Sequence, residues 1–221
     1  EDKEKYHPDD EMWNKAENEL REVLNELGIK YTEEIGEAAF YGPKLDVNVK
    51  PAVGAEYTLS TCQLDFCLPA KFNLKYIDEN GERKTPVVLH RAILGSLDRF
   101  MAYILEETKG ALPIWLAPVQ VNIIPVNNEY HLEYAKKIEK MLEEANIRVK
   151  LDDRNEKLTY KMRESQTKKV PYTIIIGDKE RDANTVTVRL HGTTENITLD
   201  KDEFLSKIKE IIQNKNIKYD L

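Results

Sequence analysis

The sequence predicts two folded parts of different class, an α+β part followed by an α/β part with a mixed, partly parallel sheet. In residues 1–117, several short segments in succession alternate apolar and polar side chains, which is typical of antiparallel strands. In residues 118–221, extended and helical patterns take turns, which is typical of strands joined by crossover helices. The segment KGALP and a further proline at position 118 interrupt the pattern, so we predict a domain boundary between residues 117 and 118.

The first part is predicted to begin with an amphipathic helix. Acidic residues 9–11 suit the positive end of a helix dipole, apolar side chains recur at helical spacing from Met12 to Leu27, and Gly28 suits a C-terminal cap. Alternation and turn residues predict the elements that follow: strands at residues 29–35, 44–49 and 56–68, a hairpin of residues 73–77 and 84–89 around a turn at 78–81, and a helix at residues 91–107.

The second part shows the alternation of strand and helix patterns that predicts parallel pairing. Its predicted elements, in chain order, are a strand at residues 119–125, a helix at 129–145, a strand at 147–151, a helix at 156–168, strands at 171–176 and 184–190, and a helix at 200–213.

Length and composition exclude several classes of protein. The chain has 221 residues, a net charge of −7 and two cysteines, which are too few for a disulfide framework. It contains no run of about 18 apolar residues, so no membrane-spanning helix is predicted. The acidic start EDKEKYHPDDE has neither the basic nor the apolar region of a signal peptide. These features predict a soluble, cytoplasmic protein.

Charge is distributed unevenly between the two parts. Residues 1–117 carry 14 basic and 22 acidic side chains, whereas residues 118–221 carry 19 and 18. The second part is therefore not basic enough to indicate nucleic-acid binding by charge alone. Its densest basic cluster lies at residues 154–169, where six basic side chains accompany two acidic ones. This pattern fits either an RNA contact or a solvated helix face.

His90 ends a predicted strand within the stretch PVVLHRAILGSLDRF. A single histidine in such a place is more often a structural hydrogen-bonding residue than a metal ligand, and no second histidine has metal-site spacing. Cys62 and Cys67 do not suggest a zinc site either, because their odd spacing puts them on opposite faces of a strand. Gln63 and Asp65 share the face of Cys67, and this face is a candidate to line a cavity.

Ser96 and Arg99 are three residues apart on the predicted helix, which would make them neighbours on one face. A guanidinium suits phosphate, and Gly95 lets a ligand or backbone approach closely. These residues fit a nucleotide phosphate site as well as they fit a solvated Arg99 paired with Asp98 or Glu106.

Tyr41 and Lys44 flank a Gly-Pro turn in AFYGPKLD. By pattern alone, a core tyrosine and a surface lysine are more common than a pair of ligand-binding residues. The sequence contains no glycine-rich phosphate loop and no Ser/His/Asp nucleophile elbow.

An ordered set of segments resembles the C-terminal part of bacterial-type threonyl-tRNA synthetases, a family of class II aminoacyl-tRNA synthetases. The segments are EMWNKAE, GEAAFYGPKLD, STCQLDFCLP, HRAILGSLDRF, WLAPVQV, RVKLDDRNEKLTYKMRESQTKKVPYTIIIGDKE and VTVRLHG. The resemblance covers nearly the whole chain. It implies the end of an antiparallel class II catalytic domain at residues 1–117 and an α/β anticodon-binding domain at residues 118–221.

The resemblance implies roles for residues of the first part. HRAILGSLDRF is similar to motif 3 of the class, which makes Arg99 a ligand of ATP phosphate and places Ser96 on the nucleotide side. His90 would be one of three ligands of a catalytic-site zinc that binds the amino group and hydroxyl of threonine and so rejects valine. The positions that match the pocket around threonine and the adenylate are Tyr41, Lys44 and Gln63. The implied cofactors are zinc and ATP with magnesium.

The resemblance also implies how the second part reads tRNA(Thr), whose anticodons end in GU. Unpaired loop bases are read by hydrogen bonds to their edges and by stacking. The matching positions are Asn155, Lys157, Lys169, Glu180 and Arg189. The chain departs from many relatives at Lys169, where they have arginine, and at residues 57–58, where Tyr-Thr replaces Trp-Gln. The first change keeps the charge but loses the bidentate fork.

By this resemblance, the family's two other zinc ligands, its ATP-binding motif 2 and its dimer-forming motif 1 lie upstream of the residues present here. We therefore expect this chain to be a part of a threonine–tRNA ligase that is inactive alone. The complete enzyme would be a homodimer that takes threonine, ATP and tRNA(Thr), without membrane or DNA partners. The alternative is a non-catalytic synthetase-like module that binds tRNA or other RNA.

Overall fold

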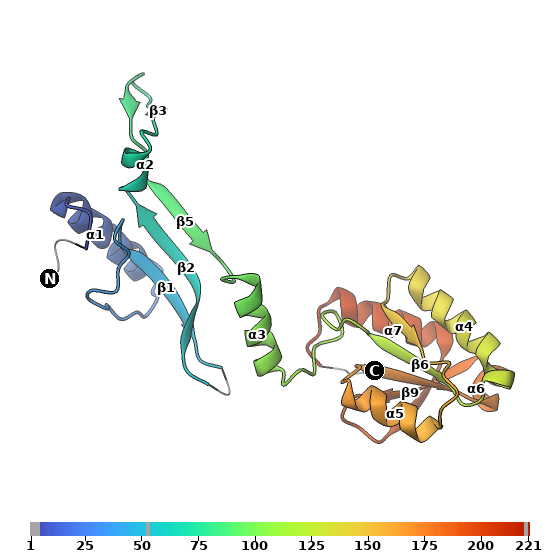
Figure 1. Ribbon diagram of the computed structural model, residues 1–221. Coiled ribbons are helices and arrows are strands. Elements are labelled where there is room, and N and C mark those ends of the chain that lie inside the picture. The colour runs from blue at the N-terminus through green and yellow to red at the C-terminus, as the bar shows by residue number, and fades with distance from the viewer. Residues whose placement is uncertain (1–4, 52–53, 219–220) are drawn as a thin grey trace. The chain divides into compact units, whose positions relative to one another are not determined.

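The computed structural model describes residues 5–51, 54–218 and 221, which form two compact units (Figure 1). The first unit ends at Tyr103 and the second begins at Ile104. Ile114 is fully buried in the core of the second unit, and its carbonyl oxygen accepts a hydrogen bond from Gln120 Nε2 at 2.9 Å. The predicted domain boundary between residues 117 and 118 stays a prediction.

The first unit is built on a three-stranded sheet in the order β1-β2-β5, with antiparallel pairing throughout. The predicted antiparallel class of this part is thereby confirmed. Its elements are α1 (Asp10–Glu26), β1 (Lys44–Val49), β2 (Tyr57–Asp65), α2 (Leu68–Lys71), the hairpin of β3 (Tyr76–Ile77) and β4 (Arg83–Lys84), β5 (Val88–Ala92) and α3 (Leu97–Glu107), which continues into the second unit.

Helix α1 lies against one face of this sheet (Figure 1). Ala16 shares a shallow hollow with Leu64 and Leu89, which project from that face. The edge of the Trp13 indole packs on Phe66, with ring centroids 5.5 Å apart. The alternation along β2 and β5 therefore gives one face to α1 and leaves the opposite face to polar side chains.

Residues 29–35 do not form the predicted strand. Their backbone is irregular, and Ile29 and Ile35 are 50% and 84% exposed. No described strand pairs with this segment. Apolar alternation over so short a run is not sufficient, because a strand also needs a partner for its backbone hydrogen bonds.

The helix predicted for residues 91–107 begins only at Leu97. Arg91 and Ala92 instead end β5, where they pair with β2. The chain then turns through Gly95, whose φ of +69° is left-handed and disfavoured for other residues. The apolar run around residues 86–97 fits the end of a strand and the start of a helix equally well. The spacing of its apolar residues therefore could not show where the strand ends and the helix begins.

Two further boundaries of the first unit differ from the prediction. The strand predicted for residues 56–68 ends at Asp65, and Cys67 precedes α2 rather than continuing the strand. The predicted hairpin is present around residues 78–81, but its strands are only two residues long. Val88 and the residues that follow it have left the hairpin and pair with β2 as β5.

The second unit contains a five-stranded sheet in the order β10-β9-β8-β6-β7. Strand β6 is parallel to β7 and β8, whereas the β8-β9 and β9-β10 pairs are antiparallel, so the predicted mixed sheet is confirmed. The elements are β6 (Val121–Pro125), α4 (Asn128–Glu144), β7 (Val149–Leu151), α5 (Leu158–Thr167), β8 (Tyr172–Ile176), α6 (Asp178–Ala183), β9 (Thr185–Leu190), β10 (Asn196–Asp200) and α7 (Lys201–Gln213).

Each element predicted in this part lies within two residues of its observed bounds, whereas α6 and β10 were not predicted. Helix α6 has six residues, which is too short for a helical period to show. Strand β10 is an edge strand whose exposed positions alternate with half-buried ones. The apolar and polar residues of this segment do not alternate clearly enough to predict a strand, because only one face of the strand is covered.

The hydrophobic core lies between one face of the second sheet and helices α4 and α7, on the opposite side from α5 (Figure 1). Tyr172 of β8 and Phe204 of α7 are fully buried there, with ring centroids 6.3 Å apart. We call the other face of the sheet the α5 face. Thr173 of β8 and its partner Arg189 of β9 lie on it, and so does Thr187, two residues before Arg189. Helix α5 packs on it through a 2.7 Å hydrogen bond between Ser165 Oγ and Thr173 Oγ1.

Among the described residues, no helix is both long and apolar enough to cross a membrane.

Candidate functional sites

The polar face of the first sheet brings together four of the predicted site residues. Lys44 of β1 pairs with Gln63 of β2, which pairs with His90 of β5, so the three side chains project from the same face. The Tyr41 hydroxyl donates a hydrogen bond to Gln63 Oε1, and the Tyr41 and His90 ring centroids are 5.6 Å apart. We call these four residues the Tyr41–His90 cluster. Antiparallel register, and not closeness in the chain, assembles it.

Lys44 is held in place by other polar side chains of that face. Its Nζ lies 2.6 Å from Asp46 Oδ2, and the Thr61 hydroxyl donates to Asp46 Oδ1 at 2.7 Å. The Lys44 side chain is only 26% exposed. It is therefore an ordered cation within the cluster and not the surface lysine that its sequence pattern favoured.

Gly42 lets the turn before β1 lie directly on β2. It is buried, and a Cβ built on it would overlap the carbonyl oxygen of Leu64. The Leu64 N–H donates to Pro43 O at 3.0 Å, and the Phe66 N–H donates to Tyr41 O at 3.3 Å. This close backbone approach positions Tyr41 beside Gln63 and His90.

His90 has a further partner, the buried carboxylate of Asp65. His90 Nε2 lies 2.9 Å from Asp65 Oδ2, and Asp65 Oδ1 accepts hydrogen bonds from the N–H groups of Cys67 and Leu68 at 3.0 and 2.9 Å. The Asp65 side chain is 1% exposed, whereas that of His90 is 45% exposed. Alternation placed Asp65 on the same face as Gln63, but the sequence did not reveal its contact with His90.

Within the described part of the chain, no group of three or more histidine, cysteine or acidic side chains is placed to hold a metal ion. Cys62 and Cys67 are both free thiols, and Cys67 is buried beyond the end of β2. His90 offers zinc one nitrogen, Nδ1, that Asp65 does not engage, which suits the metal's preference for imidazole. His90 can therefore serve as one zinc ligand, and the other ligands of such a site would come from outside the described residues.

Ser96 and Arg99 do not share a helix face as predicted, because α3 begins after Ser96. Ser96 Oγ accepts a hydrogen bond from the Arg99 N–H at 3.4 Å, as an N-terminal cap does. Both side chains are exposed. A Cβ on Gly95 would lie 2.8 Å from the carbonyl oxygen of Leu59, so backbone packing against β2 already requires glycine there.

Three of the five predicted anticodon positions lie at one edge of the second sheet. The carboxyl ends of β6, β7 and β8 meet there because these strands are parallel. Asn155 and Lys157 are exposed in the loop that follows β7, and Glu180 lies in α6, which follows β8. Asn128 at the start of α4 donates from Nδ2 to the carbonyl oxygen of Asp153, which ties this loop to the edge.

Glu180 and Arg189 are linked through strand β9. Glu180 Oε2 accepts from the Gly177 N–H at 2.9 Å, and Oε1 accepts from the Thr187 hydroxyl at 2.7 Å. Arg189 lies two residues along β9 on the same face, where its Nε donates to Asn196 Oδ1 at 2.9 Å. Glu180 therefore has a capping role besides any contact with a base, and Arg189 lies on the α5 face.

Lys169 lies apart from these residues, at the amino end of β8. Its backbone has a φ of +55°, and its Nζ donates to the carbonyl oxygen of Lys109. The structure therefore does not bring Lys169 together with Asn155, Lys157 and Glu180.

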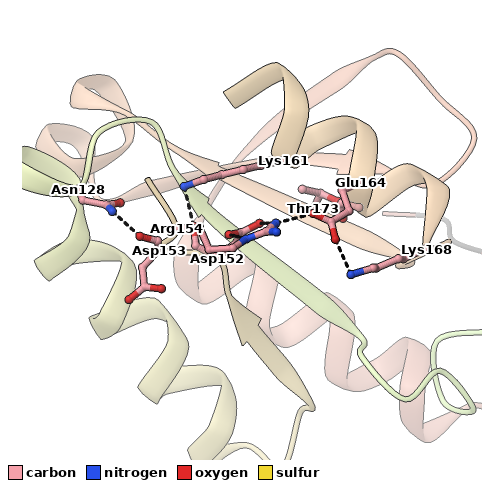
Figure 2. A network of polar contacts seen from close by, with 9 residues as sticks. Asn128, Asp152, Asp153, Arg154, Lys161, Glu164, Lys168 and Thr173 are labelled. Atoms are coloured by element: carbon pink, nitrogen blue, oxygen red, sulfur yellow. Dashed lines mark hydrogen bonds and ion pairs between the residues drawn. The ribbon is translucent and has the colours of Figure 1, made fainter. Parts of the chain in front are cut away.

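Three of the six basic residues at 154–169 bond within the protein, as Figure 2 shows: Lys161 is buried, whereas Arg154 and Lys168 are exposed but paired with acids. Arg154 forms two hydrogen bonds of 2.7 and 2.6 Å to the buried carboxylate of Asp152, and its Nη2 also lies 2.5 Å from Glu164 Oε2. Lys168 pairs with Glu164, and the buried Lys161 donates to Asp152 O at 2.9 Å. These five residues form what we call the Asp152 network.

The Asp152 network shifts the titration of its acids. Hydrogen bonds from Arg154 hold the pKa of Asp152 below its usual value, and Lys168 together with Arg154 does the same for the pKa of Glu164. The network also borders a cavity of about 300 Å³. From the sequence, the basic side chains of residues 154–169 fitted an RNA contact or a solvated helix face. Their pairing with acids was not evident, because the polar neighbours of Asp152 gave no sign that it is buried.

Two family models together match most of the chain. The model of the tRNA synthetase class II core domain (G, H, P, S and T) matches residues 1–108, and that of the anticodon binding domain matches residues 120–211. The chain therefore combines a segment of a class II aminoacyl-tRNA synthetase core with an anticodon-binding domain.

Within that class, the chain belongs to the threonyl-tRNA synthetase family. It is 55% identical over 215 residues to the threonine–tRNA ligase of Staphylococcus aureus (strain JH9), which covers 97% of this chain and 33% of that protein. The chain thus spans about a third of the length of the curated relatives it matches.

Solved structures agree with this assignment. The RNA binding domain of threonyl-tRNA synthetase from Cryptosporidium parvum Iowa II matches with a TM-score of 0.84 and 34% identity, over 98% of this chain and 53% of that one. A putative threonyl-tRNA synthetase from Aeropyrum pernix matches with a TM-score of 0.73 and 32% identity, over 95% and 50%.

Proposed function

We propose that this chain supplies part of the threonyl-adenylate site and the anticodon-reading domain of a threonine–tRNA ligase. The observation that carries the proposal is the Tyr41–His90 cluster. Three strands and a turn gather four residues on one sheet face, and these are the positions that the family resemblance assigns to the substrate pocket. A sheet that served only as a scaffold would not require an ordered cation, an amide and an imidazole in one row.

Each member of the cluster has a chemical role in the proposal. The Lys44 ammonium is a fixed positive charge for the anionic adenylate, and the hydrogen-bonded Tyr41–Gln63 pair orients polar groups of the substrate. His90 would hold zinc together with ligands outside this chain. When bound, zinc would supply a Lewis acid that coordinates the threonine hydroxyl and amino group, which valine cannot match. ATP is proposed to bind as its magnesium complex. Arg99 would contact a phosphate of that ATP, and Ser96 would lie beside it.

The second unit is proposed to read the anticodon of tRNA(Thr) from the α5 face and its carboxyl edge. Asn155 and Lys157 are exposed and leave their side chains available to RNA. Arg189 offers a half-exposed guanidinium on β9, where its Nε donates to Asn196 Oδ1 of β10. Because the Asp152 network neutralises Arg154 and Lys168 internally, we expect base contacts to contribute more than phosphate attraction. Lys169 is proposed to contact RNA at a place apart from these residues.

The 221-residue chain by itself is expected to show no threonine-dependent ATP–pyrophosphate exchange, because it holds one zinc ligand and only part of the nucleotide contacts. The complete protein that contains it should show exchange that depends on threonine and not on valine. Exchange is measured with labelled pyrophosphate for both proteins under the same conditions. Clear threonine-dependent exchange by the chain alone would contradict the division of the site that we propose.

Binding to a threonine tRNA transcript should fall by about 1–3 kcal/mol for each of the two GU anticodon bases that is changed, by analogy with base mismatches in DNA readout. Replacing Arg189 by methionine should lower affinity for the unchanged transcript and reduce the discrimination between the two transcripts. Affinity is measured by fluorescence anisotropy with the full chain at several salt concentrations, because affinity for nucleic acid depends on salt.

Lys136 provides the matched control for Arg189. It is exposed on α4, on the opposite side of the second sheet from the α5 face. Lys136→Met should therefore leave discrimination unchanged. Equal, strongly salt-dependent binding to both transcripts would instead favour the alternative function, a module that binds RNA by charge without reading the anticodon.

A further inference from the structure

We propose that Asp65 is a positioning residue that selects the tautomer of His90 and so makes Nδ1 its metal-binding nitrogen. The proposal rests on the proposed zinc site and assigns a role to a residue outside the Tyr41–His90 cluster. It follows from the contact between a buried, doubly anchored carboxylate and a half-exposed imidazole on the neighbouring strand.

The Asp65 carboxylate is held rigidly by the backbone around it. Its side chain is 1% exposed at the end of β2. Both backbone N–H groups of Cys67 and Leu68 donate to Oδ1, which leaves Oδ2 directed at His90 Nε2 at 2.9 Å. Rotation of this carboxylate would break both of these hydrogen bonds, so its direction is set by the fold and not by His90.

An ionised carboxylate can only accept hydrogen bonds. The contact at 2.9 Å therefore requires His90 Nε2 to carry the proton, and in a neutral imidazole the other nitrogen, Nδ1, then has the free lone pair. The Tyr41 ring, whose centroid is 5.6 Å from that of His90, packs beside the imidazole and limits its reorientation. A histidine that binds a metal through one nitrogen commonly donates its other N–H to a carboxylate in this manner.

The simpler explanation is that Asp65 only caps the start of α2 and that the His90 contact is incidental. The two explanations differ over Asp65→Asn. The asparagine Oδ1 can still accept from Cys67 and Leu68, so capping is preserved. Its Nδ2 replaces Oδ2 and can only donate, so His90 Nε2 must accept and the proton must move to Nδ1. A purely structural role for Asp65 predicts no such reversal.

The first measurement is the tautomer of His90 from ¹⁵N chemical shifts of the ring nitrogens in the 221-residue chain, in alkaline solution where imidazoles are neutral. We expect the Nε2–H form in the unchanged chain and the Nδ1–H form in Asp65→Asn. The amide signals of Cys67 and Leu68 report whether the fold around α2 is kept. An Nδ1–H form in the unchanged chain overturns the proposal without any variant.

The second measurement is zinc affinity of the complete protein, determined by competition with a chelator. Asp65→Asn should lower the affinity by about 10–100-fold. Asp46→Asn is the matched control, because Asp46 is a carboxylate of the same sheet face that contacts Lys44 and Thr61 but not His90. Its zinc affinity should stay unchanged.

The outcomes separate this inference from the proposed function. If the unchanged protein binds zinc and Asp65→Asn binds it equally well, the positioning role is wrong while the zinc site stands. If the unchanged protein binds no zinc, the proposed zinc site itself fails, and the role of Asp65 toward a metal fails with it.

Discussion

Replacing Arg154 by leucine is expected to lower the free energy of unfolding of the second unit at neutral pH by clearly more than a surface substitution on α5 does. The reason is that Asp152, whose side chain is 3% exposed, would keep its charge inside the protein without the two hydrogen bonds that now satisfy it. Chemical denaturation followed by circular dichroism measures the loss.

The loss should depend on pH in a defined direction. Arg154 holds the pKa of Asp152 below its usual value, so the unfolded chain takes up a proton at higher pH than the folded one. The stabilisation is therefore fully present above the ordinary aspartate pKa of about 3.9 and disappears as the pH falls through the lowered value. The difference between the unchanged and variant chains should shrink over the same range.

Arg163 supplies the control for this variant. It lies exposed on α5, within the same basic cluster but outside the Asp152 network. Arg163→Leu should change stability by less than about 0.5 kcal/mol, as surface substitutions usually do. Equal losses for the two variants would show that the network contributes no more than general surface charge.

Replacing Gly42 by alanine should destabilise the first unit by about 3 kcal/mol, at the upper end of the usual cost of overpacking. The added Cβ would overlap the carbonyl oxygen of Leu64, which belongs to a paired strand and cannot move aside as a flexible side chain could. The turn would have to move away from β2, and Tyr41 would move with it. Hydrogen exchange of the Leu64 and Phe66 amides, which bond to this turn, measures the effect.

Gly28→Ala tests whether the close approach is the cause. A Cβ at position 28 meets nothing within 4 Å, although its φ of +65° disfavours alanine. The cost should therefore be only about 1 kcal/mol, from the backbone alone. If both alanine variants exchange the Leu64 amide at the same rate, the backbone contact at Gly42 is not what holds the turn.

Local pattern predicted the elements whose apolar side chains are regularly spaced. Helices α4 and α7 were evident because each buries an apolar stripe, and β6 and β8 because both of their faces are covered; α1 shows the same spacing although only Ala16 and Leu24 are buried. The errors occurred where burial is slight. Residues 29–35 are exposed and irregular, and residues 91–96 form a strand end and a turn within an apolar run that also fits a helix.

The candidate site was predictable only in part for a related reason. Family resemblance named Tyr41, Lys44, Gln63 and His90, but it did not show that Lys44, Gln63 and His90 occupy one row across three strands. No sequence signal indicated the contact of His90 with Asp65, which is 25 residues away in the chain. Register is a property of paired strands, so residues far apart in sequence acquire a common site only when the sheet forms.

The sequence by itself determined the class of the two parts, most elements of the second, and the family to which the chain belongs. These follow from side-chain periodicity and from ordered motifs, both of which are local properties. Only the tertiary structure decided which charges are available. It buried Lys161, paired Arg154 with the buried Asp152 and Lys168 with Glu164, and placed Arg189 on the α5 face. The reason is that burial decides whether a charge must find a partner within the protein, and burial is set by how the elements pack.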